Sequence, residues 1–75
     1  MLAQVPRDLR WKDLGLSGTT RFLLHFDGIM SIEVLVANKR SELLADSIGM
    51  NNKRLAEIET ALAHHGLWLY TDQVV

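Results

Sequence analysis

Two helical patterns meet at residues 48–51, and this short joint is the strongest constraint in the sequence. The stretch "SELLADSIGMNNKRLAEIETAL" runs from Ser41 to Leu62. Four residues are too few for a flexible linker, so the two helices should pack at a fixed angle. The joint contains Gly49, which tolerates the positive φ that tight turns often require. The sequence therefore predicts a helix-turn-helix unit.

Capping residues predict where the two helices begin and end. Asn38 can cap a first helix over about residues 39–48, which ends at Gly49. Asn51 or Asn52 caps a longer second helix, which ends at Gly66. Ala45 is the small residue expected where the helices cross. The positions expected to face inward are Leu44, Ile48, Met50, Leu55, Ile58 and Leu62. An ordinary helical hairpin inside a small α+β core is the alternative.

The flanking segments predict further elements. Residues 1–18 read as an N-terminal arm or short helix that Trp11 and Leu14 pack onto the body. "SGTTRFLLHFDG" predicts a helix capped by Ser17 or Thr19 and stopped by Asp27-Gly28. In a rival interpretation, Asp-Gly is a hairpin turn between two strands.

Two segments have the alternation expected of strands. Ile32, Val34 and Val36 are β-branched and alternate with other residues, which favours a strand. The terminal "LWLYTDQVV" alternates as well and predicts a strand with a small hairpin turning at residues 71–73. Its Trp68 and Tyr70 are expected to be core or interface anchors. The expected fold class is mainly α with a small β-sheet (α+β).

Length and composition narrow the classes of protein. A chain of 75 residues holds one domain, expected over residues 19–75 beyond the arm, and it must be stabilised by its apolar core because it has no cysteine. The absence of cysteine, of a membrane-length apolar run and of a signal peptide predicts a cytoplasmic protein without a membrane partner. Eight Lys and Arg against nine Asp and Glu create no global basic field, so any nucleic-acid site depends on local charge.

The order helix, strand, helix, turn, helix, strand is that of a winged helix. Through "RFLLHF", "IEVLVA", "RSELLADSIGM" and "ALAHHGL", the span from Arg21 to Val75 resembles the C-terminal DNA-binding domain of the cyclic-AMP receptor and fumarate-nitrate regulator family. The resemblance implies a three-helix core with short terminal strands. It also implies sequence-specific DNA binding by a recognition helix over about Asn51–His65 and transcription regulation. The family reads DNA with a Glu and Arg residues early in that helix, whereas this chain has Asn52, Lys53 and Arg54 there and Glu57 where Arg is frequent.

The residues expected to contact double-stranded DNA lie at the starts of the two helices. Basic pairs open both helices and oppose the helix macrodipole, an arrangement that suits bound phosphate. Asn, Lys and Glu side chains also suit base edges in the major groove. Residues 38–62 hold four basic and four acidic residues, so a homodimer or a larger assembly is expected to supplement weak binding. The predicted contacts are Lys39, Arg40, Ser41, Asn51, Asn52, Lys53, Arg54 and Glu57.

Other chemistry has little support in the sequence. Neighbouring His64 and His65 point about 100° apart on a helix, so they do not form a metal site by themselves. No catalytic constellation or glycine-rich phosphate loop is present, so we expect no enzyme activity, cofactor or metal. The alternative function is a winged-helix protein–protein interaction module without DNA binding, favoured by the balanced charge and the 48% apolar content.

Overall fold

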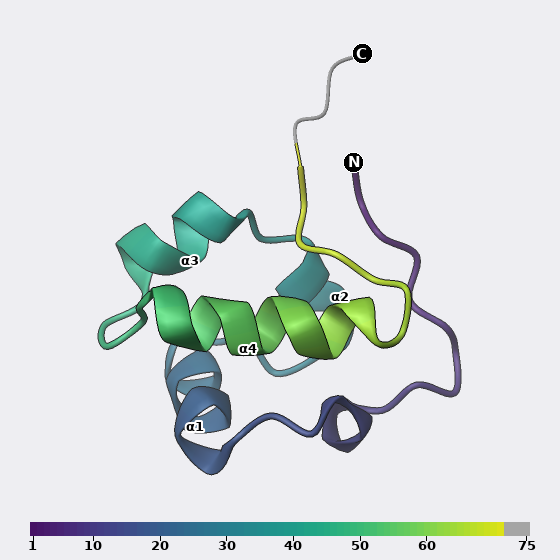
Figure 1. The fold of residues 1–75 in the computed structure, drawn as a ribbon, viewed down its shortest axis with the longest axis horizontal. Helices are drawn as coiled ribbons and strands as arrows, with labels where there is room; N and C mark the ends of the chain where they lie inside the picture. Colours follow the sequence, from purple (N-terminus) through teal and green to yellow (C-terminus); the bar gives the residue numbers. More distant parts are fainter. Residues whose placement is uncertain (72–75) are drawn as a thin grey trace.

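The computed structural model describes residues 1–71, which form four α-helices and one 3-10 helix and contain no β-strand. The longest helix, α4, crosses the middle of the molecule with the other helices arranged around it (Figure 1). The predicted winged helix with a small β-sheet is therefore wrong, and the described chain is all-α. The elements are η1 (Trp11–Leu14), α1 (Gly18–Phe26), α2 (Ile32–Val36), α3 (Arg40–Asp46) and α4 (Asn52–Ala63).

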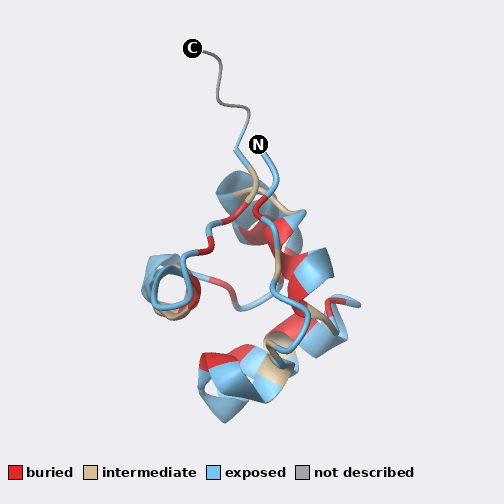
Figure 2. Ribbon diagram, turned by 90° about the vertical axis from the view of Figure 1, so that its right-hand side faces the viewer, coloured by how far each residue is buried: buried red, intermediate tan, exposed pale blue. Residues whose placement is uncertain are grey.

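One hydrophobic core joins all four α-helices. Figure 2 shows the buried residues on the sides of the helices that face inward. The N-terminal segment takes part in this core through Ala3, Leu14 and Leu16, and Trp11 packs against it. The predicted packing of Trp11 and Leu14 onto the body is thus confirmed. The large side chains with the least exposure are Leu24, Leu35, Leu43, Leu55, Ile58 and Leu62.

Helix α1 forms where its caps predict it. The Ser17 hydroxyl accepts a hydrogen bond from the Thr20 N–H at 3.3 Å, and the helix ends at Asp27 before Gly28, which has a φ of 82°. The rival hairpin at Asp27-Gly28 is therefore wrong. The inward side of α1 carries Thr20 and Leu24, while both of its phenylalanines face solvent.

The strand predicted over residues 32–36 is a short helix, α2. The Ser31 hydroxyl caps it by accepting a hydrogen bond from the Val34 N–H at 3.2 Å. Ile32, Leu35 and Val36 are buried at helical spacing, whereas Val34 is 44% exposed. Five residues fit both the alternating and the helical period, and the serine cap together with the burial of Leu35 decides for the helix.

The C-terminal segment is extended but joins no sheet among the described residues. Leu67 and Leu69 are buried, whereas Trp68 is 41% exposed and Tyr70 is partly exposed, so the prediction of Trp68 and Tyr70 as core anchors is wrong. Within residues 1–71, this segment pairs through an isolated parallel bridge between Lys39 and Tyr70. The predicted turn at residues 71–73 lies mostly outside the described residues.

The helices α3 and α4 form a hairpin whose register differs from the predicted helix-turn-helix. Helix α3 ends at Asp46, and the chain reverses over residues 47–51 before α4 begins (Figure 1). Leu43 is the buried residue of α3, whereas Leu44 is 37% and Ile48 81% exposed. Ala45 is also exposed, so it does not lie at a helix crossing. The inward positions predicted from Met50 through α4 are confirmed: Met50, Leu55, Ile58 and Leu62.

Candidate nucleic-acid interface

The structure brings the starts of α3 and α4 together. The guanidinium Nη2 of Arg40 donates a hydrogen bond to the Asn52 side-chain oxygen at 3.3 Å. Its Nε lies 3.2 Å from a carboxylate oxygen of Glu59. Both partners lie on α4 two turns apart, on the side that faces α3. Arg40 therefore holds α3 against α4, and part of its charge is neutralised by Glu59.

The first turn of α4 has a well-formed cap. The Asn51 side-chain oxygen accepts a hydrogen bond from the Arg54 N–H at 2.9 Å, as the sequence predicts for one of the two asparagines. Within residues 1–71, the N–H groups of Asn52 and Lys53 have no hydrogen-bond acceptor. Two free amides at the positive end of a twelve-residue helix favour an anion.

Among the basic residues predicted to contact DNA, Lys53 makes no polar side-chain contact within residues 1–71. Its side chain is exposed. It lies in the first turn of α4, two residues after the N-cap Asn51, where its charge opposes the helix macrodipole. Nothing within the described chain explains a lysine at this position.

Arg54 stabilises the turn between α3 and α4 through a hydrogen bond to the backbone. Its Nε donates to the Gly49 carbonyl at 3.3 Å, and the residue is only partly exposed. Gly49 has a φ of 87°, a conformation that residues with a Cβ rarely adopt. This contact ties α4 to the turn before it, so Arg54 shapes the site more than it extends from it.

The remaining predicted contacts on α3 lie at its first turn. The Lys39 N–H donates to the Glu42 carboxylate at 2.7 Å, which completes the N-terminal cap. The Lys39 ammonium lies 6.0 Å from the centre of the Tyr70 ring, a cation–π distance. Ser41 is exposed on the same turn.

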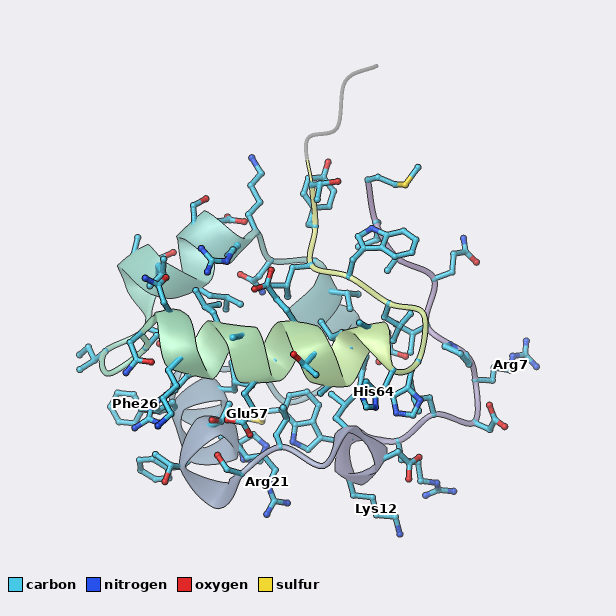
Figure 3. The ribbon with its side chains drawn as sticks, viewed as in Figure 1. Arg7, Lys12, Arg21, Phe26, Glu57 and His64 are labelled. Carbon is cyan, nitrogen blue, oxygen red and sulfur yellow. The ribbon has the colours of Figure 1, made fainter. Side chains whose placement is uncertain are left out.

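Glu57 is used for a contact between helices. Its carboxylate accepts hydrogen bonds from the Thr20 hydroxyl at 2.6 Å, the Ser17 N–H at 2.5 Å and the Ser17 hydroxyl at 3.2 Å. Figure 3 shows Glu57 in front of the junction between α4 and α1. Burial raises its pKa, but the hydrogen bonds from Thr20 and Ser17 and the charge of Arg54 lower it more, so the pKa lies below the ordinary 4.5. These hydrogen bonds give Glu57 a role within the fold, so its presence at this position does not require a contact with a base in the major groove.

We call the hydrogen bonds from Thr20 and Ser17 to Glu57 the Glu57 clamp. The sequence did not predict this clamp, because its partners are separated along the chain by 37 positions for Thr20 and 40 positions for Ser17. The signal available was the pair Ser17 and Thr20, whose hydroxyls both stand in the first turn of α1. Their hydroxyls suit a helix cap, and one of them does cap the helix. Nothing in the sequence identifies the carboxylate that also binds there.

A shallow groove of about 550 Å³ runs along α4 between Lys53 and His64, but the acid that lines it, Glu57, is already hydrogen-bonded. No three His, Cys, Asp or Glu side chains within residues 1–71 gather closely enough to hold a metal ion. None of the described helices has the length and apolar character needed to cross a membrane.

Comparison of the sequence with protein-family models and with curated proteins found no match to either. The site therefore has to be interpreted from its own geometry. That geometry combines two free helix amides, one exposed lysine and an arginine that bridges two helices.

Proposed function

We propose that the chain binds double-stranded DNA weakly, through one phosphate group at the start of α4. Lys53 supplies the charge, and the N–H groups of Asn52 and Lys53 supply hydrogen bonds to the phosphate oxygens. The observation that carries the proposal is the exposed Lys53, which has no partner within residues 1–71 and opposes the helix macrodipole. The cysteine-free composition fits a cytoplasmic setting.

Contacts to the backbone account for this site better than base reading does. The Asn52 oxygen already accepts a hydrogen bond from Arg40, so bidentate pairing with adenine would require that bond to break. Glu57 is held by α1 in the same way. Lys53 and the two amides need no rearrangement to meet a phosphate.

The proposed affinity is low because few contacts are available. Each neutralised phosphate changes the slope of log K against log salt by about 0.9 in duplex DNA, so a single copy that neutralises one phosphate should show a slope of about one in magnitude. The acidic residues Glu42, Asp46 and Glu59 lie on the same two helices and weaken the local field further. Tight binding therefore needs a second copy or another protein.

The test is fluorescence anisotropy of a labelled random-sequence duplex, titrated with protein across a salt series. Lys53→Gln should weaken binding about fivefold and reduce the salt slope by about one. Lys12→Gln is the matched control because it removes the same charge from η1, where Figure 3 shows Lys12 pointing away from α4. The control should bind as the wild type does.

Two results would overturn the proposal. One is equal weakening by both lysine variants, which would indicate only non-specific attraction by net charge. The other is a lack of binding at low salt while circular dichroism shows the helices intact. The second result would favour a protein-interaction module, for which exposed aromatic side chains on α1 are the supporting observation.

A further inference from the structure

Helix α1 presents two phenylalanine rings to solvent. Phe22 is 66% and Phe26 71% exposed, and their ring centres lie 6.3 Å apart with an angle of 35° between the planes. We call these two side chains the aromatic patch. Figure 3 shows Phe26 pointing outward from α1 at the end of the molecule that carries the α3–α4 hairpin.

The fold does not require the aromatic patch. Thr20 and Leu24 already provide the buried side of α1, and the helix is capped at both ends. The two rings contact each other, which is a small gain for an exposed helical pair. Large aromatic side chains exposed next to each other are typical of protein interaction surfaces.

The charge around the aromatic patch limits what can cover it. Helix α1 contains Arg21 and no acidic residue, and the patch itself carries no charge. Aromatic rings pair favourably with other aromatic rings, so a second uncharged aromatic surface would complement the patch. A second copy of this chain offers one, and the net charge of −1 per copy produces little repulsion between copies.

The spacing of the rings suits a two-fold arrangement. Phe22 and Phe26 are one helical turn apart, so they lie symmetrically on either side of position 24. When two α1 helices pack antiparallel through their exposed sides, with the two-fold axis at the height of residue 24, Phe22 of each copy faces Phe26 of the other. The contact between Phe22 and Phe26 then occurs twice, as an isologous interface requires, and the four rings form one cluster.

The area available points to a weak dimer. A phenylalanine buries about 150–250 Å² when fully covered. Ile48 is 81% exposed in the turn between α3 and α4. The next residue, Gly49, lies so close to α1 that an added Cβ would be 3.2 Å from Leu23, so this turn adjoins α1. Four rings and two isoleucines together bury on the order of 1,000 Å², the low end for specific protein interfaces.

We propose that the chain self-associates into a weak symmetric dimer through the aromatic patch on α1. The dimer dissociates on dilution because its interface is small. It does not depend on the proposed DNA binding, although it would supply the second copy that tight binding needs.

The test is sedimentation equilibrium without DNA over roughly a hundredfold range of concentration. The weight-average mass of the wild type should rise from monomer towards dimer. The double variant Phe22→Ser/Phe26→Ser should associate at least about tenfold more weakly. Leu2→Ser is the matched control, since Leu2 is 55% exposed on the N-terminal segment away from α1, and it should associate as the wild type does.

The geometry has its own test, because the chain contains no cysteine that would interfere. When Phe22→Cys and Phe26→Cys chains are mixed and oxidised, the disulfide between unlike chains should form faster than either disulfide between like chains. Equal rates would overturn the antiparallel arrangement.

The proposal as a whole has two contradicting outcomes. A wild type that stays monomeric over the whole range would overturn it, as would a double variant that associates as tightly as the wild type. Circular dichroism of the variant confirms that its helices are intact. If the monomeric wild type binds DNA and the double variant does not, the patch faces nucleic acid and the dimer is excluded.

Discussion

The hydroxyl of Thr20 donates a hydrogen bond to the carboxylate of Glu57 at 2.6 Å, and this contact joins α1 to α4. Thr20 is fully buried, so the bond lies at the edge of the core. The same carboxylate also accepts the Ser17 N–H at the start of α1. The Glu57 carboxylate, in the middle of α4, thereby accepts hydrogen bonds from two donors at the start of α1.

Removing this carboxylate should destabilise the fold. Glu57→Ala leaves the Thr20 hydroxyl and the Ser17 N–H without their acceptor, and we expect a loss of about 2–3 kcal/mol in the free energy of unfolding. Thr20→Val keeps the shape but removes one donor and should cost about 1–2 kcal/mol. Urea denaturation of the two single variants and the double variant measures their coupling. Additive losses would show that the two groups do not interact.

Glu59→Gln is the control for charge. Glu59 pairs with Arg40, but the side chains are 44% and 47% exposed. Exposed ion pairs typically contribute less than about 1 kcal/mol. A loss as large as that of Glu57→Ala would contradict the assignment of Glu57 as the main clamp.

The contribution of Glu57 should depend on pH with a definite sign. Because its pKa is lower in the folded protein than the ordinary 4.5, the ionised form favours folding. The stabilisation is complete above 4.5 and is lost as the pH falls below that value through the lowered pKa. The measurement is the difference in unfolding free energy between the wild type and Glu57→Gln. It should be constant near neutral pH and shrink in acid, whereas a difference that widens in acid would reverse the sign.

Two substitutions of Asn51 should distinguish its effect on stability from its effect on DNA binding. Asn51→Ala removes the cap of α4 and should cost about 1 kcal/mol in the free energy of unfolding. Asn51→Asp keeps an acceptor for the Arg54 N–H and should be at least as stable as the wild type. Its new negative charge should nevertheless weaken duplex binding several-fold by repelling phosphate. Unchanged binding of a stable Asn51→Asp protein would place the DNA elsewhere.

Gly49 should tolerate no side chain. Its φ of 87° is strained for other residues, and an added Cβ would lie 3.2 Å from a methyl carbon of Leu23. We expect Gly49→Ala to cost at least about 1–2 kcal/mol. Gly28→Ala is the matched control, since Gly28 has a φ of 82° and open space around it. The extra loss at Gly49, measured by thermal denaturation, reports the contact with α1, and equal losses would argue against that contact.

The register of α3 can be tested with two neighbouring leucines. Leu43 is 1% exposed and Leu44 is 37% exposed. Leu43→Ala should cost about 2–5 kcal/mol, whereas Leu44→Ala should cost less than about 1 kcal/mol. Denaturant titration distinguishes them. The predicted helix-turn-helix register, with Leu44 inward, requires the opposite order.

Local signals in the sequence determined the N-terminal caps of α1 and α4, whereas the predicted Asn38 cap of α3 is wrong because that helix is capped at Lys39. Ser17 and Asn51 cap α1 and α4 as predicted, because a cap depends only on a side chain and an N–H three residues later. The inward side of α4 was also predictable, since twelve residues are long enough for the helical period to be unambiguous. The basic residues at the starts of α3 and α4 could be identified for the same local reason.

Tertiary packing decided the rest. Residues 32–36 satisfy both periods, and the core selected the helix that buries Leu35. Helix α3 ends at Asp46, before the turn, and Leu43 rather than Leu44 faces inward. Residues 1–71 contain no β-strand, so this part of the chain is not a winged helix. The partners of Arg40 and Glu57 lie 12 to 40 residues away along the chain. Contacts at such separations depend on how the helices pack against one another, and the spacing of residues within one segment carries no information about that packing.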